Sequence, residues 1–206
     1  MAKRLMLIRH GQVESNVTRH YPGWSDEDLD STGLHQASHL ASRLSSEHLD
    51  MVYTSPLRRA YTTATILAGP HNIEPETRRD IIELNLGDWQ GLNSAEISRG
   101  WPGLWEQSRY DPSELRIPGG ESYPQLTARV VGAFRDITEG SAGGTVVMVT
   151  HDAVIRVLVA HVLNVSNSIY RRITIGNTSI TVIETSGSRQ YLSRLNDTAH
   201  LESGFA

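Results

Sequence analysis

The sequence predicts an α/β fold with three layers, in which helices cover both faces of a mostly parallel central sheet. Short apolar segments of strand length alternate with longer segments whose apolar residues recur at helical spacing. The stretch 145–150 is apolar almost without interruption, as expected for a strand buried on both faces. With 206 residues, the chain is long enough for one such domain, which we expect to span 1–206.

The first half of the chain predicts two strand–helix units. A strand at 5–8 precedes a helix capped by Ser31 or Thr32, and a strand at 51–54 precedes a helix opened by Ser55-Pro56. Apolar residues at helical spacing predict a buried face on each helix. These are Leu34, Ala37, Leu40, Ala41 and Leu44 in the first, and Leu57, Ala60, Tyr61, Ala64 and Leu67 in the second.

The second half begins with a capping box, in which Ser122 and Gln125 precede a long amphipathic helix. The strand at 145–150 leads into a nearly all-apolar helix at 153–163. Segments 178–184 and 190–194 predict a closing hairpin that turns through Ser186-Gly187-Ser188.

Residues 69–120 are less regular than the rest of the chain. They hold three of the four Trp and five of the eight Pro residues. We expect this stretch to be an excursion of loops and short helices that covers the active site.

Composition excludes several classes of function. There is no Cys, so disulfides, thiolate metal sites and cysteine nucleophiles are excluded. The net charge of −4 and the lack of a basic stretch argue against a nucleic-acid partner. No apolar run approaches the roughly 20 residues of a membrane span, and no signal peptide is evident, so we expect a cytoplasmic protein. His35 and His39 are one helical turn apart but lack a third ligand, so no metal or other cofactor is expected.

Charged and imidazole side chains follow three of the predicted strands. Arg9 and His10 follow the first strand, Arg58 lies in the helix after the second, and His151 follows the strand at 145–150. In open α/β sheets, ligands bind beyond the carboxyl ends of the strands. If these strands are neighbours, the four side chains meet at one edge and form a cationic pocket suited to an anion.

Six segments in the same order resemble the histidine phosphatase superfamily, which includes cofactor-dependent phosphoglycerate mutases. The resemblance extends from residue 7 to about 156. It rests on Leu7-Ile8-Arg9-His10-Gly11-Gln12, Gly33-Leu34-His35-Gln36-Ala37, Ser55-Pro56-Leu57-Arg58-Arg59-Ala60 with Thr63-Ala64, Glu83-Leu84-Asn85-Leu86-Gly87-Asp88-Trp89-Gln90-Gly91, Pro118-Gly119-Gly120-Glu121-Ser122, and Val149-Thr150-His151-Asp152. The fold implied is that of the phosphoglycerate mutase-like proteins.

The resemblance also implies a role for each candidate residue. His10 attacks phosphorus and becomes a phosphohistidine, while His151 donates a hydrogen bond to the phosphoryl group. Arg9, Asn16 and Arg58 bind its oxygens, on which negative charge accumulates. Glu83 protonates the leaving oxygen and then activates water, with Glu14 and Asp88 as the nearest rivals for this role.

One segment departs from the family pattern. Where the family often has Asp-x-Pro-Leu-Thr, this chain has Asp26-Glu27-Asp28-Leu29-Asp30. The added negative charge lies near the expected phosphate loop, and the sequence leaves open whether it reshapes the loop or disfavours highly anionic substrates.

These observations favour a phosphoric monoester hydrolase acting on small molecules, in the branch that contains broad-specificity and α-ribazole-phosphate phosphatases. A phosphoglycerate mutase-type phosphotransferase is the first alternative, but the resembling mutases are longer and have Glu-Arg-His-Tyr-Gly around the acid. A weakly catalytic interaction module is the second alternative. The sequence leaves the substrate and the oligomeric state open, a homodimer included.

Overall fold

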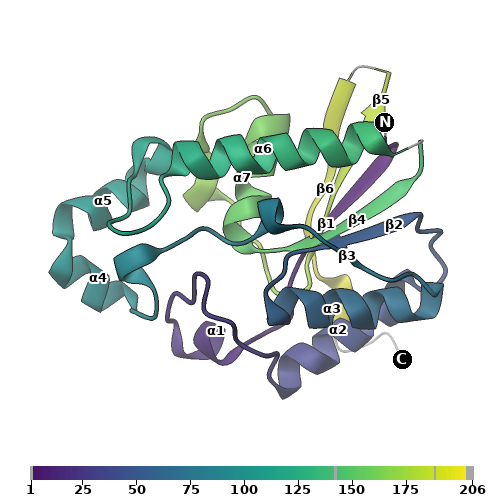
Figure 1. Ribbon diagram of the computed structural model, residues 1–206, viewed down its shortest axis with the longest axis horizontal. Helices are drawn as coiled ribbons and strands as arrows, with labels where there is room; N and C mark the ends of the chain where they lie inside the picture. Colours follow the sequence, from purple (N-terminus) through teal and green to yellow (C-terminus); the bar gives the residue numbers. More distant parts are fainter. Residues whose placement is uncertain (1, 142, 188, 203–206) are drawn as a thin grey trace.

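The computed structural model describes residues 2–141, 143–187 and 189–202. Within these residues, six strands form one sheet in the order β3-β2-β4-β1-β5-β6 (Figure 1). They are β1 (Arg4–Arg9), β2 (Met51–Thr54), β3 (Glu76–Thr77), β4 (Thr145–Thr150), β5 (Ile180–Ser186) and β6 (Arg189–Asp197). Strands β1 to β4 run parallel, and β5 and β6 add antiparallel pairs beside β1. The predicted mostly parallel sheet is therefore confirmed.

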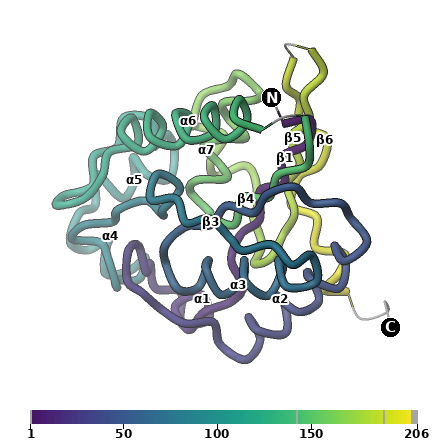
Figure 2. The backbone as a smooth tube through the Cα atoms, turned by 45° about the vertical axis from the view of Figure 1, so that its right-hand side comes forward, coloured from purple at the N-terminus to yellow at the C-terminus, as the bar shows by residue number. Residues whose placement is uncertain are grey.

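Helices cover both faces of this sheet. The α-helices are α1 (Glu14–Thr18), α2 (Ser31–Leu44), α3 (Arg58–Ala68), α4 (Ser94–Gly100), α5 (Pro102–Tyr110), α6 (Tyr123–Gly140) and α7 (Asp152–Val162). Both views show α2 and α3 on one face and α6 and α7 on the other (Figure 1, Figure 2). Successive side chains of β1 point to opposite faces of the sheet, and each face has its own hydrophobic core. Leu5 and Leu7 pack with α6 and α7, whereas Met6 and Ile8 pack with α2 and α3.

Helix α2 begins at Ser31, one or two residues earlier than a cap at Ser31 or Thr32 would place its start. The carboxylate of Asp30 accepts a hydrogen bond from the Gly33 N–H at 2.7 Å, so Asp30 is the N-cap in place of Ser31 or Thr32. Leu34 was predicted to be buried and is 43% exposed. Gly33 takes the inward position of the first turn, and the next residue of a helix points about 100° away from it.

Helix α3 begins at Arg58, two residues later than the Ser55-Pro56 pattern predicts. Ser55 does not cap the helix, because Leu57 is the N-cap residue; the Ser55 hydroxyl lies 2.7 Å from Nε2 of His151 and accepts a long hydrogen bond from the Leu57 N–H at 3.4 Å. Pro56 instead lies in the turn between β2 and α3. Tyr61, predicted on the buried face, is 43% exposed.

The elements of the second half agree with the sequence. Ser122 and Gln125 form the predicted capping box of α6, with hydrogen bonds of 3.3 and 2.8 Å between them. Helix α7 starts directly after His151, and β5 pairs with β6 as the predicted hairpin. Ser188 of the predicted turn lies outside the described residues.

Between α3 and α6 the chain forms short elements. These are β3, α4, α5 and the 3₁₀ turns η1 (Gly69–His71), η2 (Arg79–Ile81), η3 (Gly87–Trp89) and η4 (Pro112–Glu114). Both views place α4 and α5 at the opposite end of the molecule from the β5–β6 hairpin (Figure 1, Figure 2). Two further 3₁₀ turns, η5 (Asn167–Arg172) and η6 (Ala199–Leu201), follow α7 and β6. Of the helices within the described ranges, none has the length and apolarity to cross a membrane.

The loop after β1 packs against the start of α2 without room for a side chain. A Cβ on Gly33 would lie 2.1 Å from the carbonyl oxygen of Gln12. In contrast, a Cβ on Gly132, within α6, would meet no atom within 4 Å.

We therefore predict opposite effects of the same substitution on the free energy of unfolding. Gly33→Ala should lower it by about 1–3 kcal/mol, the usual cost of forcing atoms into a packed region. Gly132→Ala should raise it by about 0.5–1 kcal/mol, because alanine is the better helix former. Urea titration measures both, and a Gly33→Ala protein as stable as the wild type would contradict the described packing.

Candidate active site

The sheet order places the ends of three strands side by side. Strand β4 lies between β2 and β1, so Ser55, His151 and His10 follow three adjacent strands. The His10 N–H donates to the carbonyl of Thr150 at 3.0 Å, which extends the β1–β4 pairing by one residue. As a result, the two imidazole rings lie 5.2 Å apart between their centres, and both are buried.

The hydrogen bond made by His10 determines its tautomer. Its Nδ1 lies 2.7 Å from the carbonyl oxygen of Gly11. A carbonyl can only accept, so Nδ1 carries the proton and Nε2 keeps a free lone pair. Burial, followed by the positive charges of Arg59 and Arg9, holds the pKa of His10 well below its usual range. His10 is therefore a neutral imidazole with a nucleophilic nitrogen.

His151 is also neutral but is oriented by a side chain. Its Nε2 lies 2.7 Å from the hydroxyl oxygen of Ser55. Burial, Arg59 and His10 lower the pKa of His151 well below its usual range. The buried Nδ1 of His151 has no hydrogen-bond partner among the described residues.

The structure brings Arg59, and not Arg58, to the histidines. The side chain of Arg58 is 58% exposed and pairs with Asp28 at 2.5 Å. Arg59 is fully buried and donates to the carbonyls of Gly23 and Ser25, both at 2.7 Å. Arg58 was chosen from its place in the first turn after β2, but successive helical residues point about 100° apart and only the second one points inward. The Arg-Ala spacing of the family pattern falls on Arg59-Ala60 and could have identified the correct arginine.

Three buried side-chain nitrogens around His10 have no hydrogen-bond partner within the part of the chain that the structure describes. They are Nε of Arg9, Nε of Arg59 and Nδ1 of His151. A second nitrogen of Arg9 donates to the carbonyl of Ile175 at 2.7 Å, which fixes this side chain. The two arginine nitrogens are charged donors, and buried donors without acceptors are costly, so the arrangement suits an anion rich in oxygen atoms. In the described ranges, no group of three His, Cys, Asp or Glu side chains is placed to hold a metal ion.

Asn16 lies beside this cluster and is oriented by a residue that the sequence analysis missed. The side-chain oxygen of Asn16 accepts from the Val13 N–H at 3.2 Å and from the Asn177 amide at 3.1 Å. The amide nitrogen of Asn16 is therefore left to donate. Asn177 also donates to the carbonyl of His10 at 3.0 Å, so it orients both residues. Asn177 is far away in sequence, and no pattern around it indicated this contact.

Glu83 supplies a carboxyl group with a shifted pKa. Burial first, and then the negative charge of Asp152, raise its pKa to about 6, although Arg59 and Arg9 oppose the shift. The indole N–H of Trp24 donates to the backbone carbonyl of Glu83 at 2.7 Å and fixes the segment that carries it. A carboxyl group with this pKa exchanges protons near neutral pH, as an acid–base catalyst requires.

The acidic stretch at 26–30 is used in structural contacts. Asp26 accepts from the Arg58 N–H at the start of α3, and Asp28 pairs with the Arg58 side chain. Asp30 caps α2 and also accepts from the Gln12 side chain at 3.0 Å. The departure from the family pattern therefore shapes the loop between α1 and α2.

A buried His–Arg–His cluster at the ends of adjacent parallel strands, with a carboxyl group close to it, defines a protein class that acts on phosphoryl groups. Residues 5–198 match the histidine phosphatase superfamily (branch 1), and the chain belongs to this family.

Several relatives match this chain over most of its length. Phosphoserine phosphatase 1 of Hydrogenobacter thermophilus is 34% identical over 198 residues, which cover 96% of this chain and 94% of that protein. A 2,3-bisphosphoglycerate-dependent phosphoglycerate mutase of Cytophaga hutchinsonii is 34% identical over 170 residues, 79% of this chain and 78% of that protein. Among solved structures, Bacillus stearothermophilus YhfR superposes with a TM-score of 0.92 at 31% identity, over 98% of this chain and 100% of that one. The predicted family and fold are thus confirmed.

The two neighbouring arginines allow a matched test of the site. We predict that Arg59→Gln weakens the binding of inorganic phosphate by about ten- to a hundredfold, because it removes charged donors from a buried anion site. Arg58→Gln should change the affinity by less than about threefold, since an exposed ion pair contributes little. Titration calorimetry measures both, with thermal unfolding as a control for folding. Equal losses in the two variants, or a larger loss in Arg58→Gln, would contradict the assignment.

Proposed function

We propose that this protein hydrolyses small-molecule phosphate monoesters through a phosphohistidine intermediate on His10. The observation that carries the proposal is the protonated Nδ1 of His10, bonded to the Gly11 carbonyl, which leaves Nε2 as a free nucleophile beside unsatisfied cationic donors. Relatives named as phosphoserine phosphatases give further support for hydrolysis.

In the first half-reaction, Nε2 of His10 forms a bond to phosphorus while the bond from phosphorus to the ester oxygen breaks. The hydrogen bond from Nδ1 to Gly11 stabilises the positive charge that the ring acquires. Arg9, Arg59 and His151 donate to the equatorial oxygens, and Asn16 adds a neutral donor. Protonated Glu83 gives its proton to the departing oxygen, so the product leaves as an alcohol.

In the second half-reaction, water attacks the phosphohistidine. Glu83, now a carboxylate, takes a proton from the water as its oxygen bonds to phosphorus, and the bond from phosphorus to Nε2 breaks. Phosphate leaves, and both His10 and Glu83 return to their starting forms. A mutase would return the phosphoryl group to a second oxygen of a bound phosphoglycerate instead, so the same intermediate serves both reactions.

The first test compares phosphate release by the wild type and by His10→Ala across a panel of phosphate monoesters without added metal. We expect the variant to lose at least about 10³-fold in rate, because it lacks the imidazole that forms the covalent intermediate. An alkaline quench of the wild type during turnover should yield a phosphorylated peptide that contains His10. Undiminished release by His10→Ala would exclude this nucleophile. If no ester is hydrolysed, the mutase alternative is tested with a bisphosphoglycerate primer.

The negative charge of Asp152 near Glu83 leads to a prediction for the pH dependence of kcat/KM. The acid must be protonated for the first half-reaction, so kcat/KM should fall as the pH rises through the pKa of Glu83, about 6. Asp152 raises this pKa, and removing its charge in Asp152→Asn should move the decline to lower pH. Asp88→Asn is the control, because this exposed carboxylate is not among the charges that shift Glu83. The substrate ionises equally in all three proteins. A decline at the same or a higher pH in Asp152→Asn would contradict the proposed coupling.

A further inference from the structure

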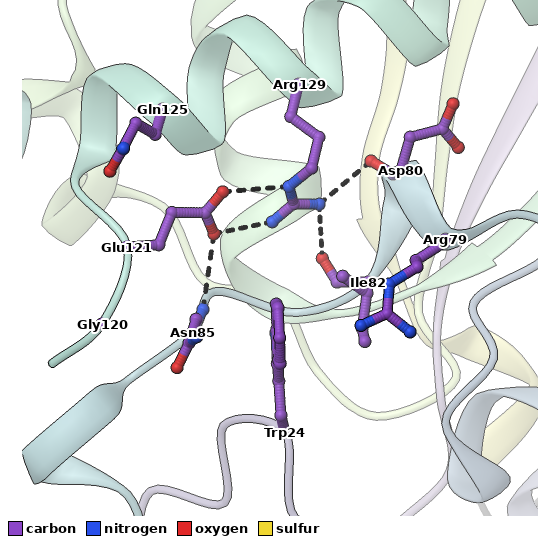
Figure 3. A pocket seen from close by; sticks show the side chains of 9 residues that line it. All are labelled: Trp24, Arg79, Asp80, Ile82, Asn85, Gly120, Glu121, Gln125 and Arg129. Carbon is purple, nitrogen blue, oxygen red and sulfur yellow. Dashed lines mark hydrogen bonds and ion pairs between the residues drawn. The ribbon is translucent and has the colours of Figure 1, made fainter.

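A second pocket lies beside the catalytic cluster and has a separate lining. Its volume is about 540 Å³, and it opens between α6 and the segment that runs from η2 to η3 (Figure 3). The lining includes Trp24, Arg79, Asn85, Glu121, Gln125 and Arg129. None of the residues that line it is His10, Arg59, His151 or Glu83.

The carboxylates of this pocket are already neutralised by neighbouring arginines. Glu121 forms a two-point ion pair with Arg129, with distances of 2.9 and 2.7 Å. Asp80 forms a similar pair with Arg78, at 3.1 and 2.5 Å. The negative charge of each carboxylate is therefore balanced by a neighbouring guanidinium.

The side-chain amides of Asn85 and Gln125 accept hydrogen bonds through their oxygens, whereas their nitrogens make none to the described residues. The side-chain oxygen of Asn85 accepts from the Gly87 N–H at 3.0 Å, and that of Gln125 accepts from the Ser122 N–H at 2.8 Å. Each amide thus leaves its NH₂ group free to donate.

Arg79 supplies a cation that makes no hydrogen bond or ion pair to any of the residues described. Its guanidinium carbon lies 5.6 Å from the ring centre of Trp24, and Figure 3 shows Trp24 between Arg79 and Asn85 with Arg129 above them. The side chains of Arg79, Asn85 and Gln125 therefore offer donors to the pocket, and that of Arg79 is charged. The indole of Trp24 and the side chain of Ile82 add apolar surface to the lining.

We propose that this pocket binds a small organic anion, a carboxylate or a phosphate group attached to a flat apolar body. The anionic group binds the guanidinium of Arg79, and the apolar body lies against the ring of Trp24. This site is separate from the one that holds the phosphoryl group during catalysis.

The wall of the pocket also supports the catalytic carboxyl group. Trp24 donates its indole N–H to the backbone carbonyl of Glu83 at 2.7 Å, and Arg129 donates to the same oxygen at 3.4 Å. A ligand that binds more tightly to one position of the Trp24 ring than to others stabilises that position. Because Trp24 is hydrogen-bonded to the backbone of Glu83, the ligand thereby shifts Glu83 as well. Occupancy of the pocket therefore changes the rate of turnover, and this second statement rests on the proposed function.

Binding is tested by titration calorimetry on the full chain with benzoate, phenylphosphonate and benzylamine. Enough vanadate to abolish turnover is present throughout, so that the catalytic cluster is occupied. The variants are Arg79→Gln and, as a matched control, Arg135→Gln, which removes an exposed arginine of α6 that does not line the pocket. We expect both anions to bind the wild type and the control, Arg79→Gln to bind at least about tenfold more weakly, and benzylamine not to bind. Unchanged binding by Arg79→Gln, equal binding of the amine, or no binding of either anion would overturn the site.

The link to Glu83 is tested by kcat and KM measured with and without saturating benzoate. We expect kcat to change in the wild type, and the change to be lost in Trp24→Phe, which keeps a ring but removes the N–H that holds Glu83. Benzoate binding without any change in kcat would overturn the link. A protein that hydrolyses no ester but still binds benzoate through Arg79 would contradict the proposed hydrolysis and leave the binding site supported.

Discussion

The buried positive charge of Arg59 is the constraint on which the site depends. Burying a cation is costly unless polar groups replace its hydration. Here the carbonyls of Gly23 and Ser25 do so, and they belong to the loop that also presents Trp24 to Glu83. Thr63 adds a further link, since its hydroxyl binds the Gly11 N–H and the Arg59 carbonyl. Arg59 therefore joins α3 to the loop of Gly23, Trp24 and Ser25, which contacts the backbone of Glu83, and Thr63 joins α3 to Gly11.

This arrangement also explains why the histidines are neutral. Positive charge and burial act together to lower the pKa values of both rings, so neither competes with a substrate for protons near neutral pH. The same cations oppose the rise in the pKa of Glu83, but burial and Asp152 outweigh them. Burial and the neighbouring charges thus give a neutral imidazole at His10 and a carboxyl group at Glu83 that can still hold a proton. The combination is what phosphoryl transfer to an imidazole requires.

Much of this could be predicted from the sequence, because local patterns determine it. The strand at 145–150, the capping box at Ser122 and the two histidines at strand ends are each encoded within a few residues. Three features depend on contacts between distant segments and were missed or wrong. Arg58 was preferred to Arg59, since the direction of a side chain at a helix start depends on where the helix begins.

The other two misses have the same origin. The hydroxyl of Ser55 was assigned to a helix cap, but a neighbouring strand brings His151 within 2.7 Å of it. Asn177 reaches the carbonyl of His10 from a loop 167 residues away, which no local pattern reveals. For the acidic stretch at 26–30, the sequence left the role of the charges open. Their role follows from the contacts that they make with Arg58 and with the start of α2 in the folded structure.

The most direct test of the account is a crystal structure of the protein with vanadate, which adopts the five-coordinate geometry of phosphoryl transfer. The account predicts a bond from vanadium to Nε2 of His10. It also predicts equatorial oxygens in contact with Arg9, Arg59 and Nδ1 of His151, and an apical oxygen facing the carboxyl group of Glu83. Vanadate bound to another side chain, or held by Arg58 in place of Arg59, would contradict it.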